Sequence, residues 1–248
     1  AAVSPPQTIG VIDRVSMVLE EMGVFFPRPH ALAVEPKSGA VYTASLSVNQ
    51  IATLYPEDES IELFTLAGEK MHTLVQFAIS PNGQWMAGTT ELTSSIFLFD
   101  LTKNIEIGPV DTILVNSAPW HPSFTPDGRW VYAGNNRDNT VSVIDMNSRT
   151  LVNVIEGNGL SQPHGSATSH DGQYVYISNR NLETPGMQMG SSSSVPLPAR
   201  ETGYQPRYDL GDNSQIGTIV VIDIYSQSIV KVIEIEKYGS GLGVARAN

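Results

Sequence analysis

The sequence has no cysteine, few basic residues and no long hydrophobic run, and each absence excludes a class of protein. Without cysteine in its 248 residues, the chain forms no disulfide, thiolate metal site, cysteine nucleophile or covalent c-type haem link. Lys and Arg number 14 against 25 Asp and Glu, and this net charge of −11 disfavours nucleic acid as a partner. No run of about 18 apolar residues predicts a membrane span. No Gly-rich phosphate loop is present, so we expect no nucleotide cofactor.

Four turn signals recur at an almost constant spacing. They lie at residues 36–39 (PKSG), 81–83 (PNG), 126–128 (PDG) and 170–172 (HDG), and their first residues are 45, 45 and 44 positions apart. A strand-like run follows each turn, and Asn-Gly or Asp-Gly supplies the positive φ that tight hairpins need. The repeat therefore predicts one hairpin in each unit of about 45 residues.

A second signal recurs in step with the turns: an apolar run that ends in aspartate. The aspartates are Asp13, Asp100, Asp145 and Asp223, and Tyr55 takes the matching place in the interval after Asp13. A unit of four short antiparallel strands repeated roughly every 45 residues is typical of a β-propeller blade. We predict an all-β fold, a β-propeller of four-stranded antiparallel blades with about four full blades plus partial blades at both termini. A β-sandwich with coincidental spacing is the alternative.

The two ends of the sequence match only parts of a blade. Residues 7–22 match a third and fourth strand, and residues 242–245 (LGVA) match a first strand. Either the ends pair in one incomplete blade, or the chain belongs to a larger ring, which we favour because open sheet edges invite pairing. We predict a single β-propeller domain or a segment of a larger propeller over 1–248, with a long loop insertion at 181–214. In the second case, another chain or segment completes the propeller.

Two stretches of the repeat resemble a known family. Residues 128–145 (GRWVYAGNNRDNTVSVID) and 163–179 (PHGSATSHDGQYVYISN) are similar to the YVTN-type propeller repeat, a resemblance that covers nearly the whole chain. That family includes surface proteins, periplasmic binding proteins and redox enzymes. The AAV start is what signal-peptide cleavage leaves, although it is equally an arbitrary boundary. Together with the low charge content, it predicts a periplasmic or extracellular location.

Four of the five histidines lie just before or at the first strand of a unit, which lines the channel of a propeller. They are His30, His72, His121 and His164. Converging imidazoles are how a cysteine-free protein binds a transition metal, so we predict a metal site there. Their register is uneven, since His121 and His72 lie five and nine positions before the next turn and the other two lie six before it. A one-residue shift turns a strand side chain to the other face, and ordinary core histidines are the alternative.

Loops between second and third strands open on the same face as these histidines. The 181–214 insertion is such a loop, predicted to cover the channel and to bring Met187 and Met189 toward the imidazoles, unless these methionines simply pack or lie exposed. Thioether beside imidazole favours copper. The face also carries charged candidates for binding an anionic substrate or moving protons: Glu91, Arg137, Asp138 and Arg180.

The channel position of the four histidines also resembles copper-containing propeller oxidoreductases of the nitrous oxide reductase and thiocyanate dehydrogenase types. That resemblance implies copper and redox chemistry on a small inorganic substrate, and the absence of cysteine predicts no haem c. Those sites use more histidines than this chain offers, so a complete cluster needs ligands from a further segment. We predict an exported β-propeller that binds a transition metal, with copper preferred. The alternatives are a metal carrier and a non-catalytic scaffold whose channel face binds a small molecule or a protein.

Overall fold

A computed structural model of the chain describes residues 7–181, 216–236 and 238–245. Its strands form five antiparallel sheets, four of four strands and one of two, and within each sheet the strands follow one another in sequence order. Each sheet is therefore a meander joined by hairpins. The fold prediction is confirmed: the chain is an all-β protein built of four-stranded propeller blades. Among the described residues, no helix is long and apolar enough to cross a membrane.

The strands have the following bounds. The two-stranded sheet is β1 (Thr8–Ile12) and β2 (Leu19–Gly23). The first blade is β3 (Pro29–Val34), β4 (Val41–Ser45), β5 (Gln50–Tyr55) and β6 (Ser60–Thr65). The second is β7 (Leu74–Ile79), β8 (Trp85–Thr90), β9 (Ser95–Asp100) and β10 (Asp111–Leu114), with the short 3-10 helix η1 (Ile105–Ile107) before β10. The third is β11 (Pro119–Phe124), β12 (Trp130–Asn135), β13 (Thr140–Asp145) and β14 (Thr150–Ile155). The fourth is β15 (Pro163–Thr168), β16 (Tyr174–Asn179), β17 (Gly217–Asp223) and β18 (Ser228–Ile235).

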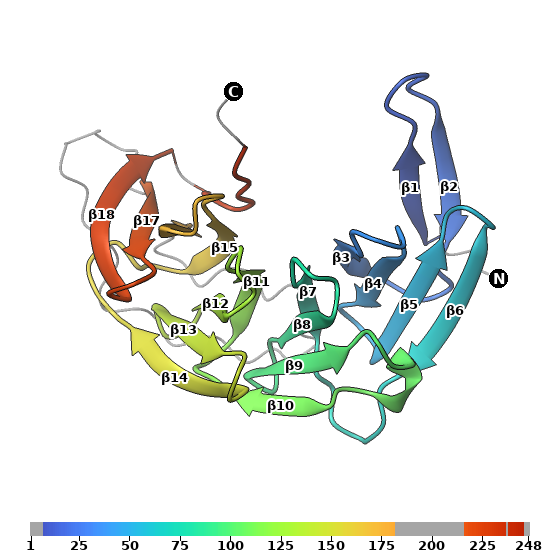
Figure 1. Ribbon diagram of the computed structural model, residues 1–248, viewed down its shortest axis with the longest axis horizontal. Coiled ribbons are helices and arrows are strands. Elements are labelled where there is room, and N and C mark those ends of the chain that lie inside the picture. The colour runs from blue at the N-terminus through green and yellow to red at the C-terminus, as the bar shows by residue number, and fades with distance from the viewer. Residues whose placement is uncertain (1–6, 182–215, 237, 246–248) are drawn as a thin grey trace.

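The four blades stand side by side around an open arc (Figure 1). Their first strands, β3, β7, β11 and β15, contact one another in succession along the inner side, and their fourth strands lie on the outside. Apolar side chains fill the space between neighbouring blades. For example, Phe97 and Met86 of the second blade pack with Ala44 and Ile51 of the first. Side chains at the start of a first strand therefore lie on the inner side of the arc.

The turns follow the chemistry expected from the sequence. Gly39, Gly83, Gly128 and Gly172 have φ of +72°, +75°, +72° and +71°, a region that favours glycine. The aspartates that end the third strands cap the next turn, as at Asp100, whose Oδ1 accepts from the backbone N–H and the hydroxyl of Thr102. Hydrogen bonding to the hydroxyl of Thr102 holds the pKa of the Asp100 carboxyl below its usual value. This aspartate series is structural.

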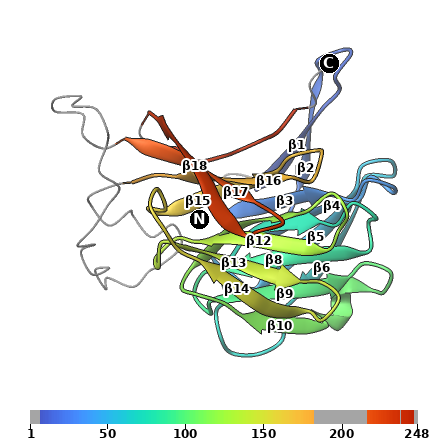
Figure 2. The same ribbon diagram turned by 60° about the vertical axis from the view of Figure 1, so that its left-hand side comes forward.

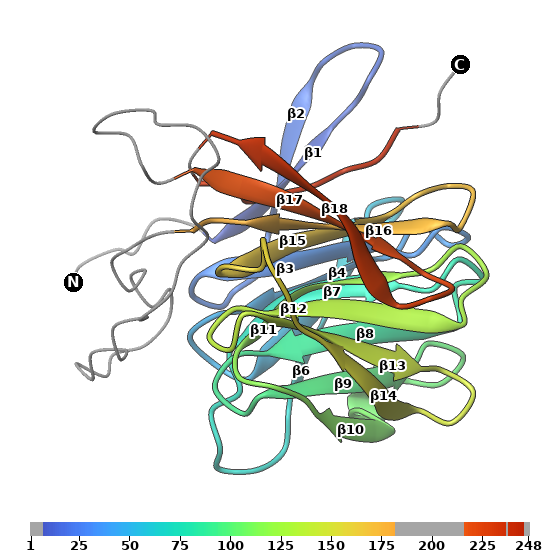
Figure 3. The ribbon, with the colours of Figure 1, turned by 90° about the vertical axis from the view of Figure 1, so that its left-hand side faces the viewer.

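The two ends of the chain differ from the complete blades. The hairpin β1–β2 projects beyond the stacked strands of the other sheets (Figures 2 and 3). The C-terminal residues 242–245, expected to form a first strand, have no regular secondary structure. The segment just before them lies on the fourth blade, where Ser178 Oγ donates to the Ser240 carbonyl at 2.5 Å. Only Asn181 of the predicted insertion falls within the described residues.

Tyr132 offers a test of the core. Its side chain is fully buried in β12, and its hydroxyl has no hydrogen-bond partner among the described residues. Burial raises the pKa of Tyr132 to about 12. Because a buried unpaired hydroxyl is costly, Tyr132→Phe is expected to raise the free energy of unfolding by about 1 kcal/mol in urea titrations. Tyr55→Phe, which removes a hydroxyl that donates to Glu62, is expected to lower it instead. Equal losses in both variants would contradict this account.

Candidate functional site

Each first strand has a β-bulge near its start, and three of the predicted histidines lie in these bulges. In β11, Trp120 and His121 together face the single residue Gly134 of β12, and in β15, His164 and Gly165 together face Ser178 of β16. In β3, His30 is the extra residue. A bulge re-aims side chains, so the uneven offsets of these histidines from their turns do not force them onto opposite faces.

His121 and His164 come together with Trp120 and Arg180 on the inner side of the arc. The His121 and His164 ring centroids are 4.6 Å apart, and the Trp120 ring centroid is 4.4 Å from that of His164. The Arg180 guanidinium lies 5.3 Å from the Trp120 ring centroid. We call these four residues the inner cluster. They come from β11, from β15 and from the end of β16, so packing of two neighbouring blades assembles them.

The hydrogen bond from Arg180 determines which ring nitrogen of His164 carries the proton. Its Nη2 lies 2.7 Å from His164 Nε2, and because a guanidinium only donates, that ring nitrogen is the acceptor. The His164 proton is therefore on Nδ1. Burial lowers the pKa of His164 to about 2, and the charges of His121 and Arg180 act in the same direction. Arg180 also donates to Ser240 Oγ, but no described Asp or Glu lies within ion-pair distance of it. The cluster thus holds a half-buried cation without a described carboxylate partner.

One ring nitrogen of His121 has no hydrogen-bond partner among the described residues. This nitrogen is Nε2, which is buried, and Trp120 Nε1 is likewise buried and without a partner in the described part of the chain. Burial lowers the pKa of His121 to about 4, assisted by the charges of His30 and Arg180, so the imidazole is neutral near pH 7. A neutral imidazole with an unpaired nitrogen is a competent metal ligand.

His30 lies near this cluster, because it hydrogen-bonds to the backbone of Val75, whose side chain packs with Trp120. Its Nδ1 is 2.6 Å from the carbonyl oxygen of Val75. A carbonyl only accepts, so Nδ1 carries the proton, and a neutral His30 has its lone pair on Nε2. Backbone carbonyls orient metal-binding histidines in this way.

His72 is set apart from the other three. It precedes β7 and packs edge-on against Phe97, with ring centroids 4.8 Å apart, while its Nδ1 lies 2.9 Å from Thr93 Oγ1. Burial lowers the pKa of His72. Across the described ranges, no group of three His, Asp or Glu side chains is arranged to hold a metal ion. The structure therefore brings together three of the four predicted histidines, and they do not form a site for a bare ion.

The charged loop residues make a second, separate arrangement. Arg137 Nη2 and Glu91 Oε1 are 3.6 Å apart, and both side chains are largely buried. Burial raises the pKa of Glu91, and the Arg137 charge opposes this. Asp138 instead accepts from the backbone N–H of Ser117, which ties two loops together. Met187 and Met189 lie outside the described residues.

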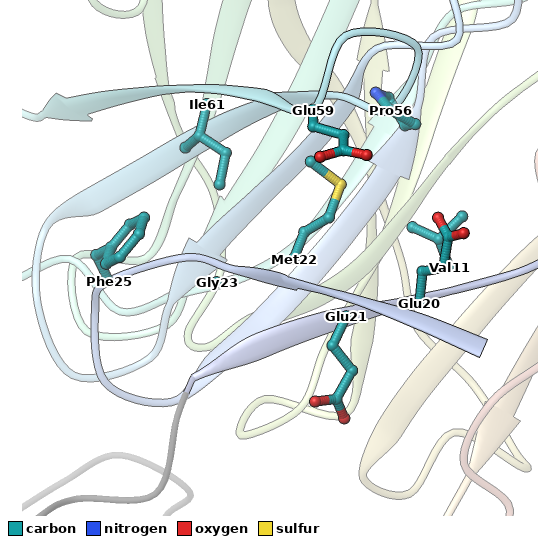
Figure 4. Close-up of a pocket in the computed structure, with 9 residues that line it drawn as sticks. All are labelled: Val11, Glu20, Glu21, Met22, Gly23, Phe25, Pro56, Glu59 and Ile61. Carbon is teal, nitrogen blue, oxygen red and sulfur yellow. The ribbon is translucent and has the colours of Figure 1, made fainter.

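A hollow of about 590 Å³ lies away from the histidines, between the hairpin β1–β2 and the β5–β6 turn (Figure 4). Met22 points across it toward Glu59, whereas Glu21 points away. Val11, Phe25 and Ile61 supply apolar walls. The hollow has no convergent set of donors, and we assign it no chemistry.

Two members of this region carried no clear functional signal in the sequence. In the sequence Trp120 is simply the neighbour of His121, and only the structure shows its ring against His164. Ser240, whose hydroxyl accepts a hydrogen bond from Arg180, lies 60 residues further along the chain in a segment that contains no motif. The contact between Arg180 and Ser240 is visible only in the three-dimensional structure.

The bladed sheets and the polar inner face define a β-propeller. No protein-family model and no curated protein matches the chain. Among solved structures, Kuenenia stuttgartiensis hydrazine synthase is similar with a TM-score of 0.63 and 15% identity, over 86% of this chain and 51% of that one. Dihydro-heme d1 dehydrogenase NirN in complex with DHE is similar with a TM-score of 0.62 and 12% identity, over 94% of this chain and 43% of that one. The chain spans about half the length of these two proteins, and the likeness establishes the fold.

These neighbours correct the cofactor prediction of copper without haem c. Neither is named for copper, and one is named for a haem d1 substrate and was solved with DHE bound. The difference has a physical reason. Absence of cysteine excludes thioether attachment within these 248 residues, but it does not bear on a macrocycle held non-covalently. Met187 and Met189, whose thioethers favoured copper, lie outside the described residues.

Proposed function

We propose that this β-propeller binds a haem-type tetrapyrrole non-covalently at the inner cluster. The observation that carries the proposal is the buried, unpaired Nε2 of a neutral His121 close to the half-buried Arg180, which has no described carboxylate partner. One group is suited to ligate iron, and the other is suited to pair with an anionic substituent. The proposal thus keeps a transition metal at the channel histidines, but as the iron of a macrocycle rather than as a bare ion.

The shortage of protein ligands favours a macrocycle over a bare ion. A bare transition metal needs three or more side chains, and the described residues provide no such group. A tetrapyrrole brings four nitrogen ligands of its own, so one imidazole is sufficient. When bound, its iron supplies redox chemistry, tuned by the axial ligand and its surroundings.

The remaining members of the cluster suit the edge and face of such a ligand. Haem-type macrocycles carry carboxylates, which the Arg180 guanidinium binds by charge-assisted hydrogen bonds. The donation from Arg180 to His164 and Ser240 orients that guanidinium. Trp120, 6% exposed, packs against the His164 ring and forms the apolar backing of the cluster. That NirN was solved with DHE supports the proposal through the shared fold alone. An exported location stays a prediction.

Titration of the purified protein with haemin, followed by the Soret band, tests this function. We expect saturable binding, with affinity at least tenfold weaker in His121→Ala and about tenfold weaker in Arg180→Gln, since a charge-assisted hydrogen bond contributes roughly 1.5–3 kcal/mol. The spectral signature of imidazole ligation should disappear only in His121→Ala.

The matched control is His170→Ala, which removes an exposed turn histidine and is expected to bind haemin as the wild type does. If all three variants bind equally, haemin does not use the inner cluster and the proposal fails. If the wild type shows no binding, a scaffold without a cofactor is the better description. Zn²⁺ and Ni²⁺ are titrated in parallel, because binding of these ions without haemin would favour a bare-metal site.

A further inference from the structure

The strand β1 has one paired edge and one open edge. It pairs with β2 in the register Ile12↔Leu19 to Thr8↔Gly23, and with no other strand of the described residues. By its sequence, β1 is a third strand, because residues 7–13 align with residues 139–145 of the third blade. In every complete blade the third strand pairs on both sides, as β13 does with β12 and β14. The edge of β1 that corresponds to a second-strand partner is therefore unoccupied in the described structure.

Side chains of β1 are exposed at positions where those of the complete blades are buried. Ile12 is 57% exposed, whereas Ile144 and Ile222, its counterparts in the third and fourth blades, are 0% exposed. Phe99 in the second blade is 1% exposed. The apolar surface left open at Ile12 continues into the hairpin turn, where Val15 is 94% exposed. Burial of apolar surface is favourable, so a partner that covers this edge gains affinity.

The edge also lacks the devices that normally prevent pairing. Residues 8–12 (TIGVI) contain no charge and no proline, the usual protections of a free strand edge. The strand is regular throughout, with an unbroken register to β2. Its free N–H and C=O groups thus form a template for an added strand.

The complete blades specify which side chains such a strand carries. The residues paired with the counterparts of Ile12 are all apolar: Val41, Met86, Val131 and Val175. The residues paired with the counterparts of Ile9 are all small: Ala44, Thr89, Gly134 and Ser178. A strand that completes this sheet therefore has an apolar residue opposite Ile12 and a small residue, three positions later, opposite Ile9.

We propose that the open edge of β1 binds, antiparallel, a blade-type second strand supplied from outside these 248 residues. A second copy of the chain is a poor source, because all four of its second strands are already paired on both sides. The stretches outside the described ranges are also poor sources, since residues 182–215 are rich in Ser, Pro and Gly rather than in alternating apolar residues. The occupant is thus a strand of another polypeptide segment. This inference does not depend on the proposed tetrapyrrole site.

Hydrogen–deuterium exchange with a synthetic strand tests the proposal. The probe is a peptide of residues 129–136 (RWVYAGNN), which contains the second strand of the third blade and has Val and Gly at the required spacing. At millimolar peptide, those amides of residues 8–12 that point to the open edge are expected to exchange about tenfold more slowly, as newly hydrogen-bonded strand amides do. A peptide of the same composition in scrambled order is expected to leave them unchanged.

Two variants of the full chain locate the contact. Ile12→Lys is expected to abolish the protection, whereas Val15→Lys adds the same charge in the exposed turn and should retain it. Equal protection by the scrambled peptide, or unchanged protection in Ile12→Lys, would overturn the proposal. A wild-type dimer that Ile12→Lys dissociates and the peptide does not disturb would also overturn it, because the occupant would then be a second copy.

Discussion

Between pH 7.5 and pH 5, the protein without added ligand is expected to lose on the order of 3 kcal/mol of its unfolding free energy. The cause is the inner cluster, where burial lowers the pKa of His121 to about 4 and of His164 to about 2. In the unfolded chain both imidazoles return to about 6.5. Below pH 6.5 these two imidazoles are protonated in the unfolded state but stay neutral in the folded state. Their contribution to the unfolding free energy is therefore fully present above pH 6.5 and decreases as the pH falls toward the folded pKa values.

The size of the loss follows from linkage. Each unit of pH below 6.5 costs about 1.4 kcal/mol per histidine until the folded pKa is reached, so two histidines lose on the order of 3–4 kcal/mol by pH 5. The positive charges of Arg180 and His30 oppose charging of both imidazoles. Glu91 acts in the opposite sense, because burial raises its pKa and its protonation stabilises the fold as the pH falls. The turn aspartates, such as Asp100, have lowered pKa values and therefore matter only in more acidic solution.

Urea titrations at pH 7.5, 6.5, 5.5 and 5.0 measure this slope. The double variant His121→Gln/His164→Gln cannot be protonated at either position and is expected to flatten the slope. His170→Gln, in an exposed turn, is the matched control and should retain the wild-type slope. A double variant as acid-sensitive as the wild type would show that the imidazoles are not buried as described.

The fold was predictable from the sequence because each blade repeats the same local signals. The glycine turns need a positive φ, and an apolar run that alternates or ends in aspartate predicts a short strand whatever surrounds it. The terminal segments were harder, since strand formation there depends on a partner. Residues 7–22 have a partner in each other and form a hairpin, whereas residues 241–245 pair with no described strand and stay irregular.

The site was predictable only in part. The histidine positions were visible, because first strands start after each interblade connection. The bulges were not, and they decide that His121 and His164 meet although their offsets from the next turn differ by one residue. The contact between Arg180 and His164 was also hidden, because it joins the end of one strand to the start of its neighbour. Burial, which keeps both imidazoles neutral, is a property of the assembled blades.

The largest single-residue loss of stability outside the apolar core is expected at Asn135, at about 3 kcal/mol for Asn135→Ala. This fully buried amide ends β12 and donates to Thr140 Oγ1 at 2.8 Å and to Ser142 Oγ at 2.9 Å. Ser142 Oγ also lies within hydrogen-bond distance of its Oδ1, at 3.2 Å. Alanine would leave two buried hydroxyls without this partner and open a small cavity, and both effects cost free energy.

Three variants separate the network from ordinary loss of a polar contact. Ser142→Ala leaves Asn135 bonded to Thr140 and is expected to cost about 1 kcal/mol in urea titrations. Asn153→Ala removes an amide that donates to Gln227 in a partly buried position, and less than 1 kcal/mol is expected there. The double variant Asn135→Ala/Ser142→Ala should lose less unfolding free energy than the two single variants together. Asn135→Ala already leaves the Ser142 hydroxyl without its partner, so removing that hydroxyl adds little further cost. Additive losses, or equal losses at Asn135 and Asn153, would mean that solvent reaches the end of β12 and that its loop is not anchored by this amide.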